Sequence, residues 1–503
     1  MHAVLGAAIH AASTSGWKAP TLDYHALAPE IALTLVALTV LIVDLFVDET
    51  RKHIITTVAG IGVALSAIPI LTLAADGADR SMFGGAYVVD RYSLLLKGLF
   101  LVAGYIVLLM SANYLSEGDY YEGEYSFLLI CSMLGMVVMA SSRDLITIFV
   151  ALEMLSIPAY LLAGWRKRDL KSNEAALKYY LLGVVASTVM LYGMSLVYGV
   201  TGHTQLTEIA GTLGDKPIGT VGIFMIICGF AFKVSAVPFH QWAPDTYEGA
   251  PTPITAFLSV ASKAAGFVAL TQLVFVGFLG HKNVWQPTFW GFAVATMIVG
   301  NLIALRQTNI VRMLAYSSIA QAGFILAPLA VAGEDAHTAK SSFTAISMYL
   351  LVYTLMNLGA FAMVIGVSRK TRSGEISSLG GLFSYAPLPA VMMTLFMFSL
   401  AGIPPLGGFW AKFYVFKALM DAHTIWGTLL AVIAAVNSVI AFYYYASIMR
   451  EMWMRPVPDG DRREIKFPPS LAAAMGLCAL GVVAVGVYPS LITNIVDLGS
   501  LAH

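Results

Sequence analysis

The sequence contains few charged residues for its length. Only 12% of its 503 residues are Asp, Glu, Lys or Arg, whereas 58% are hydrophobic. A soluble protein of this length needs a much more polar surface, so the composition predicts a membrane protein with many transmembrane segments. The formal net charge is zero, which gives no indication of nucleic-acid binding.

Cysteine is also scarce, and this excludes two kinds of cofactor site. Cys131, Cys228 and Cys478 lie far apart in apolar stretches without Cys-x-x-Cys spacing, so they cannot form an iron–sulfur or zinc site and are interpreted as packed thiols. The sequence has no glycine-rich nucleotide fingerprint and no histidine pair placed for a bis-histidine haem. We therefore expect that this chain binds no cofactor and that any linked redox chemistry occurs elsewhere.

Long apolar stretches predict about fourteen transmembrane helices. They are expected near residues 27–47, 54–75, 92–113, 124–140, 143–164, 173–200, 218–247, 252–279, 287–305, 309–331, 342–368, 386–420, 424–449 and 468–493. The seventh and the twelfth are too long for one straight span and contain internal prolines, which interrupt helices. The predicted fold class is therefore an all-α polytopic membrane protein with two broken helices.

The two broken helices suggest an internal repeat. Because they are five spans apart, they cross the membrane in opposite directions, as in inverted repeats related by an axis in the membrane plane. We expect helices 1–3 within residues 1–123, a first five-helix unit at 124–279, a second at 287–449, and an inner loop with helix 14 at 450–503. Lys233 precedes its break whereas Lys412 follows the second break, so these two lysines are not repeat equivalents.

The distribution of Lys and Arg among the loops predicts the orientation. With the N-terminus outside, sixteen lie in inner loops and seven on the outer side. The inner ones lie at 51–52, 166–171, 306–312, 369–372 and 450–466, and the outer ones are Lys18, Arg80, Arg91, Arg143, Lys216, Lys282 and Lys340. Since positive charge is enriched on the cytoplasmic side, we expect both termini outside.

Charged residues are expected near the middle of several spans. Lys233 lies ~20 Å and Glu153 ~15 Å along their helices, and Lys263 is similarly deep. A charge at that depth costs ~2.5 kcal/mol or more unless it faces a partner, water or the bundle interior. Burial disfavours a charged lysine and a nearby carboxylate favours it. Lys233 is the expected partner of Glu153, and a lysine that meets and leaves this carboxylate can take up and release a proton. The alternative is a structural ion pair that holds helices together.

Four other polar residues lie near span ends or beside a break. Lys178 lies about five residues inside its span and either extends to the inner surface or acts in proton transfer. Lys97 and Lys417 lie nearer to span ends and are expected to extend to the surface. His240 adjoins the break at Pro238, where it is a candidate relay residue or a polar group that satisfies the broken helix end.

At these residues the chain resembles the antiporter-like membrane subunits of respiratory complex I. The resemblance covers residues 27–493 and rests on the stretches 232–245, 247–253, 311–320 and 402–409. Within that family it is most similar to subunit N of bacterial NADH-quinone oxidoreductase, because it has a lysine at 412, about fourteen spans and an end soon after the last one.

The resemblance implies a proton-translocating subunit coupled to quinone reduction elsewhere in the complex. It implies relay roles for Glu153, Lys178, Lys233, Lys263 and Lys412. NADH, FMN, iron–sulfur clusters and quinone would belong to the rest of the complex, and the expected neighbours are the antiporter-like subunit M and the small subunit K in a bacterial inner membrane. Gln321 stands where relatives commonly have histidine, and since glutamine cannot titrate, a relay there must use water.

Two other functions remain open from the sequence. A subunit of a multi-subunit cation/proton antiporter would share the same motifs, and partner proteins carrying flavin and iron–sulfur clusters would exclude it. A scaffold that only anchors its neighbours is the second alternative, and it requires that replacing the buried lysines leaves proton pumping intact.

Overall fold

The computed structural model describes residues 22–48, 51–118, 120, 122–458 and 460–496. Helices dominate this part of the chain. The strands described in it, β1 (Arg80–Met82) and β2 (Tyr87–Val89), form one antiparallel hairpin with Ser81 opposite Val88. The prediction of an all-α membrane fold is confirmed.

The described residues contain twelve helical segments long and apolar enough to cross a membrane and two shorter apolar helices. The uninterrupted α-helices among the long ones are α2 (Ala28–Phe46), α5 (Arg91–Gly118), α6 (Glu122–Ser141), α7 (Leu145–Ala163), α8 (Leu170–Thr201), α14 (Lys282–Ala304), α15 (Ile310–Leu326), α16 (Ala336–Thr371), α20 (Ile425–Met454) and α21 (Pro469–Val487). The second span is formed by α3 (His53–Leu65) and α4 (Ala67–Asp76). These segments together agree with the fourteen predicted spans.

Both predicted broken helices are present, and they account for the two shorter apolar helices. The first consists of α10 (Pro217–Lys233) and α11 (Trp242–Gly249), and the second of α18 (Pro387–Ala401) and α19 (Gly407–Asp421). Gly402 ends α18 with a φ of +89°, a conformation that glycine adopts without the steric cost of a Cβ. Each break leaves backbone groups without a partner inside the helix at mid-span, which is tolerated only where protein or a wet cavity surrounds them.

The eighth span is irregular. It runs through α12 (Thr252–Phe257), a π-helical segment (Leu258–Ser262), α13 (Lys263–Gln272) and a second π-helical segment (Leu273–Gly277). Wider turns of this kind occur mostly as short insertions and are frequent at functional sites. The first π-helical segment ends immediately before Lys263.

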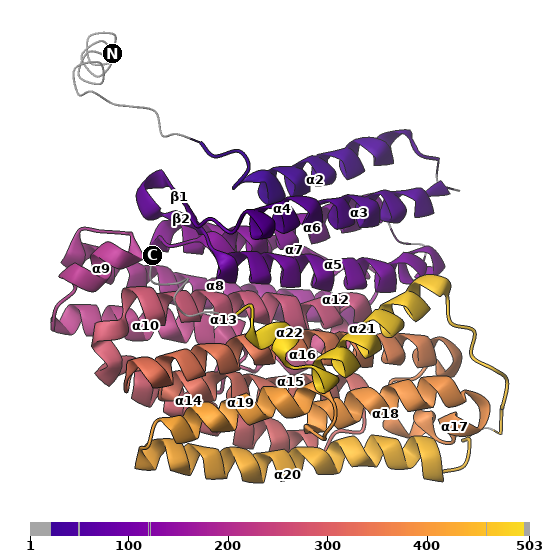
Figure 1. The fold of residues 1–503 in the computed structure, drawn as a ribbon. Helices are drawn as coiled ribbons and strands as arrows, with labels where there is room; N and C mark the ends of the chain where they lie inside the picture. The colour runs from indigo at the N-terminus through magenta and orange to yellow at the C-terminus, as the bar shows by residue number, and fades with distance from the viewer. Residues whose placement is uncertain (1–21, 49–50, 119, 121, 459, 497–503) are drawn as a thin grey trace.

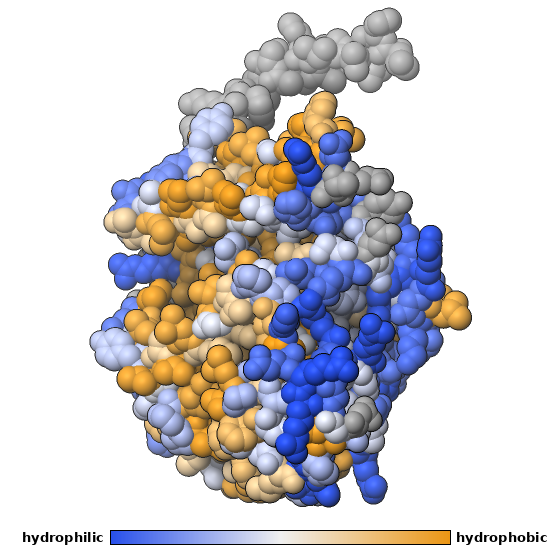
Figure 2. Space-filling view, turned by 90° about the vertical axis from the view of Figure 1, so that its right-hand side faces the viewer, coloured by the Kyte–Doolittle hydropathy of each residue, from blue (hydrophilic) through white to orange (hydrophobic). Residues whose placement is uncertain are grey.

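The helices lie side by side in one bundle (Figure 1). The hairpin and the short helix α9 (Leu206–Thr212) lie at one end of it, and α17 (Leu382–Tyr385) and the connection from α20 to α21 at the other. The eighth span and α16 are almost completely buried, whereas α2, α8 and α20 expose many apolar side chains, such as Val439. Figure 2 views the molecule from the end that carries α17, and hydrophilic residues gather in the middle and on the right of this view, beside an apolar area on the left.

Candidate functional site

Lys233 is the last residue of α10 and is 3% exposed. Its Nζ atom donates hydrogen bonds to Ser156 Oγ on α7 at 2.8 Å and to Tyr179 OH on α8 at 3.3 Å. The nitrogen also lies 5.7 Å from the centre of the Tyr179 ring. The ammonium group is therefore held by neutral hydroxyl groups at the point where the first broken helix is interrupted.

Glu153 lies half-buried on α7, where its Oε1 atom accepts a hydrogen bond from Ser187 Oγ on α8 at 2.6 Å. No ion pair joins Glu153 to Lys233 in the described part of the chain, so the expected direct contact is absent from this structure. Ser156 lies three residues after Glu153, on the same face of α7. The carboxylate is thus one helical turn from the hydroxyl that holds Lys233.

Lys263 is 3% exposed and lies where the first π-helical segment of the eighth span ends. Its Nζ atom donates to the Oγ of Ser318 at 2.6 Å and to the backbone oxygen of the same residue at 3.1 Å. Ser318 belongs to α15, so this side chain reaches the second half of the chain. The centre of the Tyr247 ring lies 5.8 Å from the nitrogen.

Lys412 lies in α19, shortly after the second break, and is 5% exposed. Its Nζ atom donates to the backbone oxygen of Ala401, the last residue of α18, at 2.8 Å. The same nitrogen lies 5.0 Å from the centre of the Phe324 ring. A Cβ atom on Gly402 would come within 2.7 Å of Lys412 Cδ, so the glycine also permits the close approach of this lysine to the break.

A row of uncharged polar groups lies between these two lysines. Ser317, the neighbour of Ser318, shares a 2.5 Å hydrogen bond with Tyr445 OH. Gln321 donates to Tyr445 OH and to the backbone oxygen of Leu400, each at 3.1 Å, and accepts from Tyr349 OH. The sequence drew attention to Gln321 but not to the tyrosines, because an aromatic residue in an apolar span usually signals packing.

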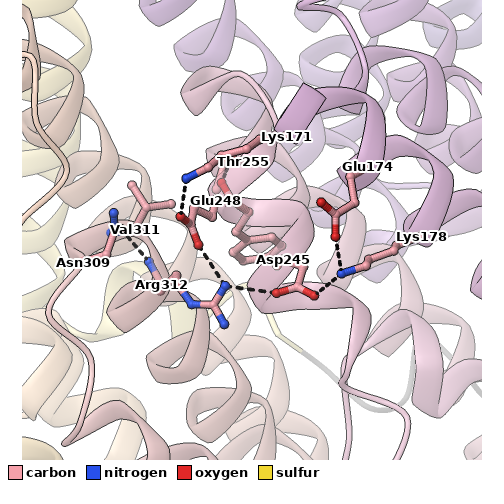
Figure 3. A network of polar contacts seen from close by, with 10 residues as sticks. Lys171, Glu174, Lys178, Asp245, Glu248, Thr255, Asn309, Val311 and Arg312 are labelled. Carbon is pink, nitrogen blue, oxygen red and sulfur yellow. Dashed lines mark hydrogen bonds and ion pairs between the residues drawn. The ribbon is translucent and has the colours of Figure 1, made fainter. Parts of the chain in front are cut away.

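Lys178 is not at the middle of the bundle. It is half-exposed and forms ion pairs with Asp245 and Glu174, each at 2.7 Å (Figure 3). Lys178 thus has anionic partners, unlike Lys233, Lys263 and Lys412 among the residues described. His240 lies in the segment between α10 and α11, and its Nδ1 atom is buried without a hydrogen-bond partner in the described residues.

The expectation for Lys97 is wrong. This side chain is fully buried, with its Nζ atom 2.8 Å from Glu30 Oε1 and 3.0 Å from Tyr87 OH. The hairpin and the first turn of α2 cover the end of α5, so Lys97 cannot extend to the surface. Lys417 is exposed on α19, as expected.

A second buried ion pair was also missed from the sequence. It joins Asp90 Oδ2 and Arg143 Nη2 at 2.8 Å, near the same hairpin. The two residues lie at the starts of α5 and α7, and the sequence analysis only counted Arg143 among the cations of the outer side. Nothing in either loop taken alone indicates this contact, because its partners are 53 positions apart.

The described residues include no group of three or more His, Cys, Asp or Glu side chains that could hold a metal ion. Cys228 and Cys478 are buried and Cys131 is half-buried, and all three are free thiols. The polar groups described beside the two breaks include lysine, carboxylate and hydroxyl groups. Two broken helices with a buried lysine beside each define a polytopic membrane protein that keeps ionisable groups inside the bilayer.

Comparison with known proteins assigns the family. Residues 142–438 match the model described as "NADH:quinone oxidoreductase/Mrp antiporter, TM". The chain is 40% identical to NADH-quinone oxidoreductase subunit N 1 of Koribacter versatilis, with 94% of this chain and 95% of that protein covered. Subunit N of Trichlorobacter lovleyi is also 40% identical, with coverage of 94% and 96%. This chain belongs to the family of NADH-quinone oxidoreductase subunit N.

Solved structures agree with this assignment. A chain of respiratory complex I from Thermus thermophilus is 30% identical, with a TM-score of 0.77 and coverage of 93% of this chain and 98% of that one. A chain of the Mrp complex from Dietzia superposes with a TM-score of 0.82 at 21% identity over 94% of this chain and 95% of that one. The second likeness indicates a shared fold.

Proposed function

We propose that this chain is the proton-translocating membrane subunit of a respiratory NADH:quinone oxidoreductase. Other subunits of that complex carry NADH, FMN, the iron–sulfur clusters and the quinone, and other membrane subunits are its neighbours. The chain is an integral part of the enzyme without holding a redox centre. Its place is the inner membrane of a bacterium.

The observation that supports this proposal is the kind of partner that each buried lysine has. Lys233, Lys263 and Lys412 all donate to hydroxyl or backbone oxygens, and none has a carboxylate within ion-pair distance among the residues described. Lys97, in contrast, is buried against Glu30. A fixed ion pair stabilises the charged form of lysine, whereas neutral oxygens can accept a hydrogen bond from either the charged or the neutral amine.

The proposed route uses these residues in spatial order. Lys178 lies at the inner mouth, and Glu153 and Lys233 form the first buried site. Lys263 is the central store, and the hydroxyl groups around Gln321 lead from it to Lys412. Glutamine cannot carry the proton itself, so transfer past this position uses water and the tyrosine hydroxyl groups. His240 is a candidate residue beside the first break.

The two five-helix units, 124–279 and 287–449, are part of the same proposal. Each contains one broken helix, and the two broken helices cross the membrane in opposite directions because an odd number of spans separates them. The excess of Lys and Arg on one side supports an inner location for the 450–466 segment and an outer location for both termini.

A cation/proton antiporter subunit is the second candidate, and the likeness to the Mrp complex chain favours it as an alternative on fold alone. Purification of the tagged chain from its own membranes distinguishes the two. Flavin and iron–sulfur subunits in the purified complex support the oxidoreductase. Their absence, with antiporter subunits in their place, would contradict it.

The scaffold alternative is tested by proton uptake in membrane vesicles driven by NADH. Lys233→Met should abolish transfer through this subunit in an assembled complex, because it removes the titratable group and keeps a side chain of similar length. Lys417→Met is the matched control, since Lys417 is exposed on the surface of α19. Unchanged uptake in both variants would favour a scaffold.

A further inference from the structure

The second half of the first broken helix, α11, carries two carboxylates that each bridge two other helices (Figure 3). Asp245 lies 2.7 Å from Lys178 Nζ on α8 and 3.0 Å from Arg312 Nη1 on α15. Glu248 lies 3.2 Å from Lys171 Nζ on α8 and 2.8 Å from the same Arg312 nitrogen. Each carboxylate uses one oxygen for α8 and the other for α15.

Two of these charges, on Arg312 and Glu248, occupy positions that their own helices disfavour. The Asn309 side chain caps α15 by accepting from the backbone nitrogens of Val311 and Arg312, which places Arg312 in the first turn. A helix dipole disfavours a cation there, and it equally disfavours an anion such as Glu248 in the last turn of α11. The pairing of Arg312 with Glu248 offsets both effects, so each residue suits its position only in the presence of the other.

Two further contacts hold α11 closely against α8 and the segment that precedes it. Arg166 Nη2 donates to the backbone oxygen of Gly249, at the end of α11, at 2.7 Å. A Cβ atom on Gly249 would lie 2.4 Å from the backbone oxygen of Lys171. Because α11 is already close-packed on this side, a contact with α15 connects the α8–α11 pair to the second half of the chain.

The position of α11 also determines the surroundings of Lys233. Trp242, the first residue of α11, donates to the backbone oxygen of Phe232 at 3.0 Å. Its ring stacks on the Tyr179 ring, with centroids 4.5 Å apart and an interplanar angle of 16°. Tyr179 OH is a hydrogen-bond acceptor for Lys233, so a shift of α11 moves a direct partner of this lysine.

Helix α15 in turn carries contacts of both later lysines. Ser318 accepts from Lys263, and the Phe324 ring lies beside Lys412. Arg312, Ser318 and Phe324 all belong to this one 17-residue helix. One rigid element therefore touches α11 at its first turn and the two later lysine sites along its length.

We propose that Arg312 is a positioning residue that couples the Lys233 site to the Lys263 site by joining α11 to α15. This inference rests on the proposed function of the chain. Arg312 has no direct contact with the proposed relay lysines 233, 263 and 412, and it acts through Asp245 and Glu248. When the charge at Lys233 changes and α11 shifts, the ion pairs transmit the shift to α15 and hence to Ser318.

The test uses Arg312→Gln in the complete complex, in membrane vesicles driven by NADH. Quinone reduction should persist, whereas the ratio of proton uptake to quinone reduction should fall. We expect a fall of at least about two-fold, which is the lower end of the effects of residues that modulate coupling at a distance. Arg312→Lys should restore most of the ratio, because the single atom Nη1 makes both ion pairs and an ammonium group has three donors. Arg306→Gln is the matched control, since Arg306 is exposed on the preceding loop and makes no ion pair within the described ranges.

Amide hydrogen exchange gives a readout of the position of α11 itself. Arg312→Gln should increase exchange across residues 234–249, whereas Arg306→Gln should leave it unchanged. If Arg312→Gln alone does not assemble, the triple variant Arg312→Gln, Asp245→Asn, Glu248→Gln leaves no unpaired carboxylate and should show the same loss of ratio.

The inference would be overturned by an unchanged ratio in assembled Arg312→Gln, or by an Arg312→Lys variant as defective as Arg312→Gln. Lys233→Met is measured alongside to separate it from the proposed function. If Lys233→Met pumps normally, the proposed function fails. If Lys233→Met stops transfer while Arg312→Gln does not, the coupling role of Arg312 alone fails.

Discussion

Replacement of Lys263 gives the sharpest test of the proposed relay, because the structure separates its effect on transfer from its effect on folding. A charged lysine at the centre of a span costs about 3 kcal/mol. Each hydrogen bond from a charged group returns about 1.5–3 kcal/mol, and Lys263 makes two to Ser318. Together the two bonds return about 3–6 kcal/mol against this cost, so Lys263→Met should lower the free energy of unfolding by between zero and about 3 kcal/mol.

The assembled Lys263→Met complex should nevertheless lose transfer. A positioned group that donates and accepts protons contributes about 10²–10⁴-fold to the rate of a proton-transfer step. Transfer through this subunit should therefore fall about 100-fold or more. Ser318 remains after the substitution, but its hydroxyl can bond back to the α15 backbone, as serines in helices do, and cannot store a proton.

Lys263→Arg distinguishes a relay from a structural cation. Guanidinium keeps its proton at physiological pH, so the variant retains a positive charge near Ser318 without a group that can be deprotonated. We expect impaired proton uptake in Lys263→Arg vesicles with subunit content equal to that of the parent, measured by native gel and immunoblot. Full activity in Lys263→Arg with loss only in Lys263→Met would refute the relay role and indicate a fixed charge.

Three further predictions follow from other parts of the structure. Glu153→Gln should lower coupled proton pumping but leave the complex assembled, because the amide oxygen can still accept from Ser187; normal pumping by the assembled variant would remove Glu153 from the relay. Lys97→Met should destabilise the protein by about 3–5 kcal/mol in a thermal unfolding assay, because it leaves Glu30 buried without its cation. The double variant Lys97→Met, Glu30→Gln should recover most of this stability, and equal stability of the single and double variants would contradict the argument. The predicted topology places Lys466 on the inner side and Asp79, next to Arg80, on the outer side. Lys466→Cys should therefore react with an impermeant maleimide only in inside-out vesicles, and Asp79→Cys only in right-side-out vesicles. Labelling of Lys466→Cys from the outside would overturn the topology.

Several features of this protein were determined by the sequence alone because they depend on local properties of the chain. A transmembrane helix requires about 20 apolar residues, so hydropathy located fourteen spans, and internal prolines at Pro238 and Pro404 identified the two broken ones. The depth of Glu153, Lys233 and Lys263 follows from counting along a helix of fixed rise. Their functional candidacy follows in turn from the cost of charge at that depth.

The partners of these charges were decided only by the tertiary structure. Lys97 meets Glu30, 67 positions earlier, and Arg312 meets Asp245, also 67 positions earlier. Such contacts depend on how each helix is rotated and which helices are neighbours, and in a chain this apolar the hydrophobic pattern hardly distinguishes one helix face from another. The separation of Glu153 from Lys233 has the same origin, because a hydroxyl on the next turn of α7 occupies the place that the sequence assigned to the carboxylate.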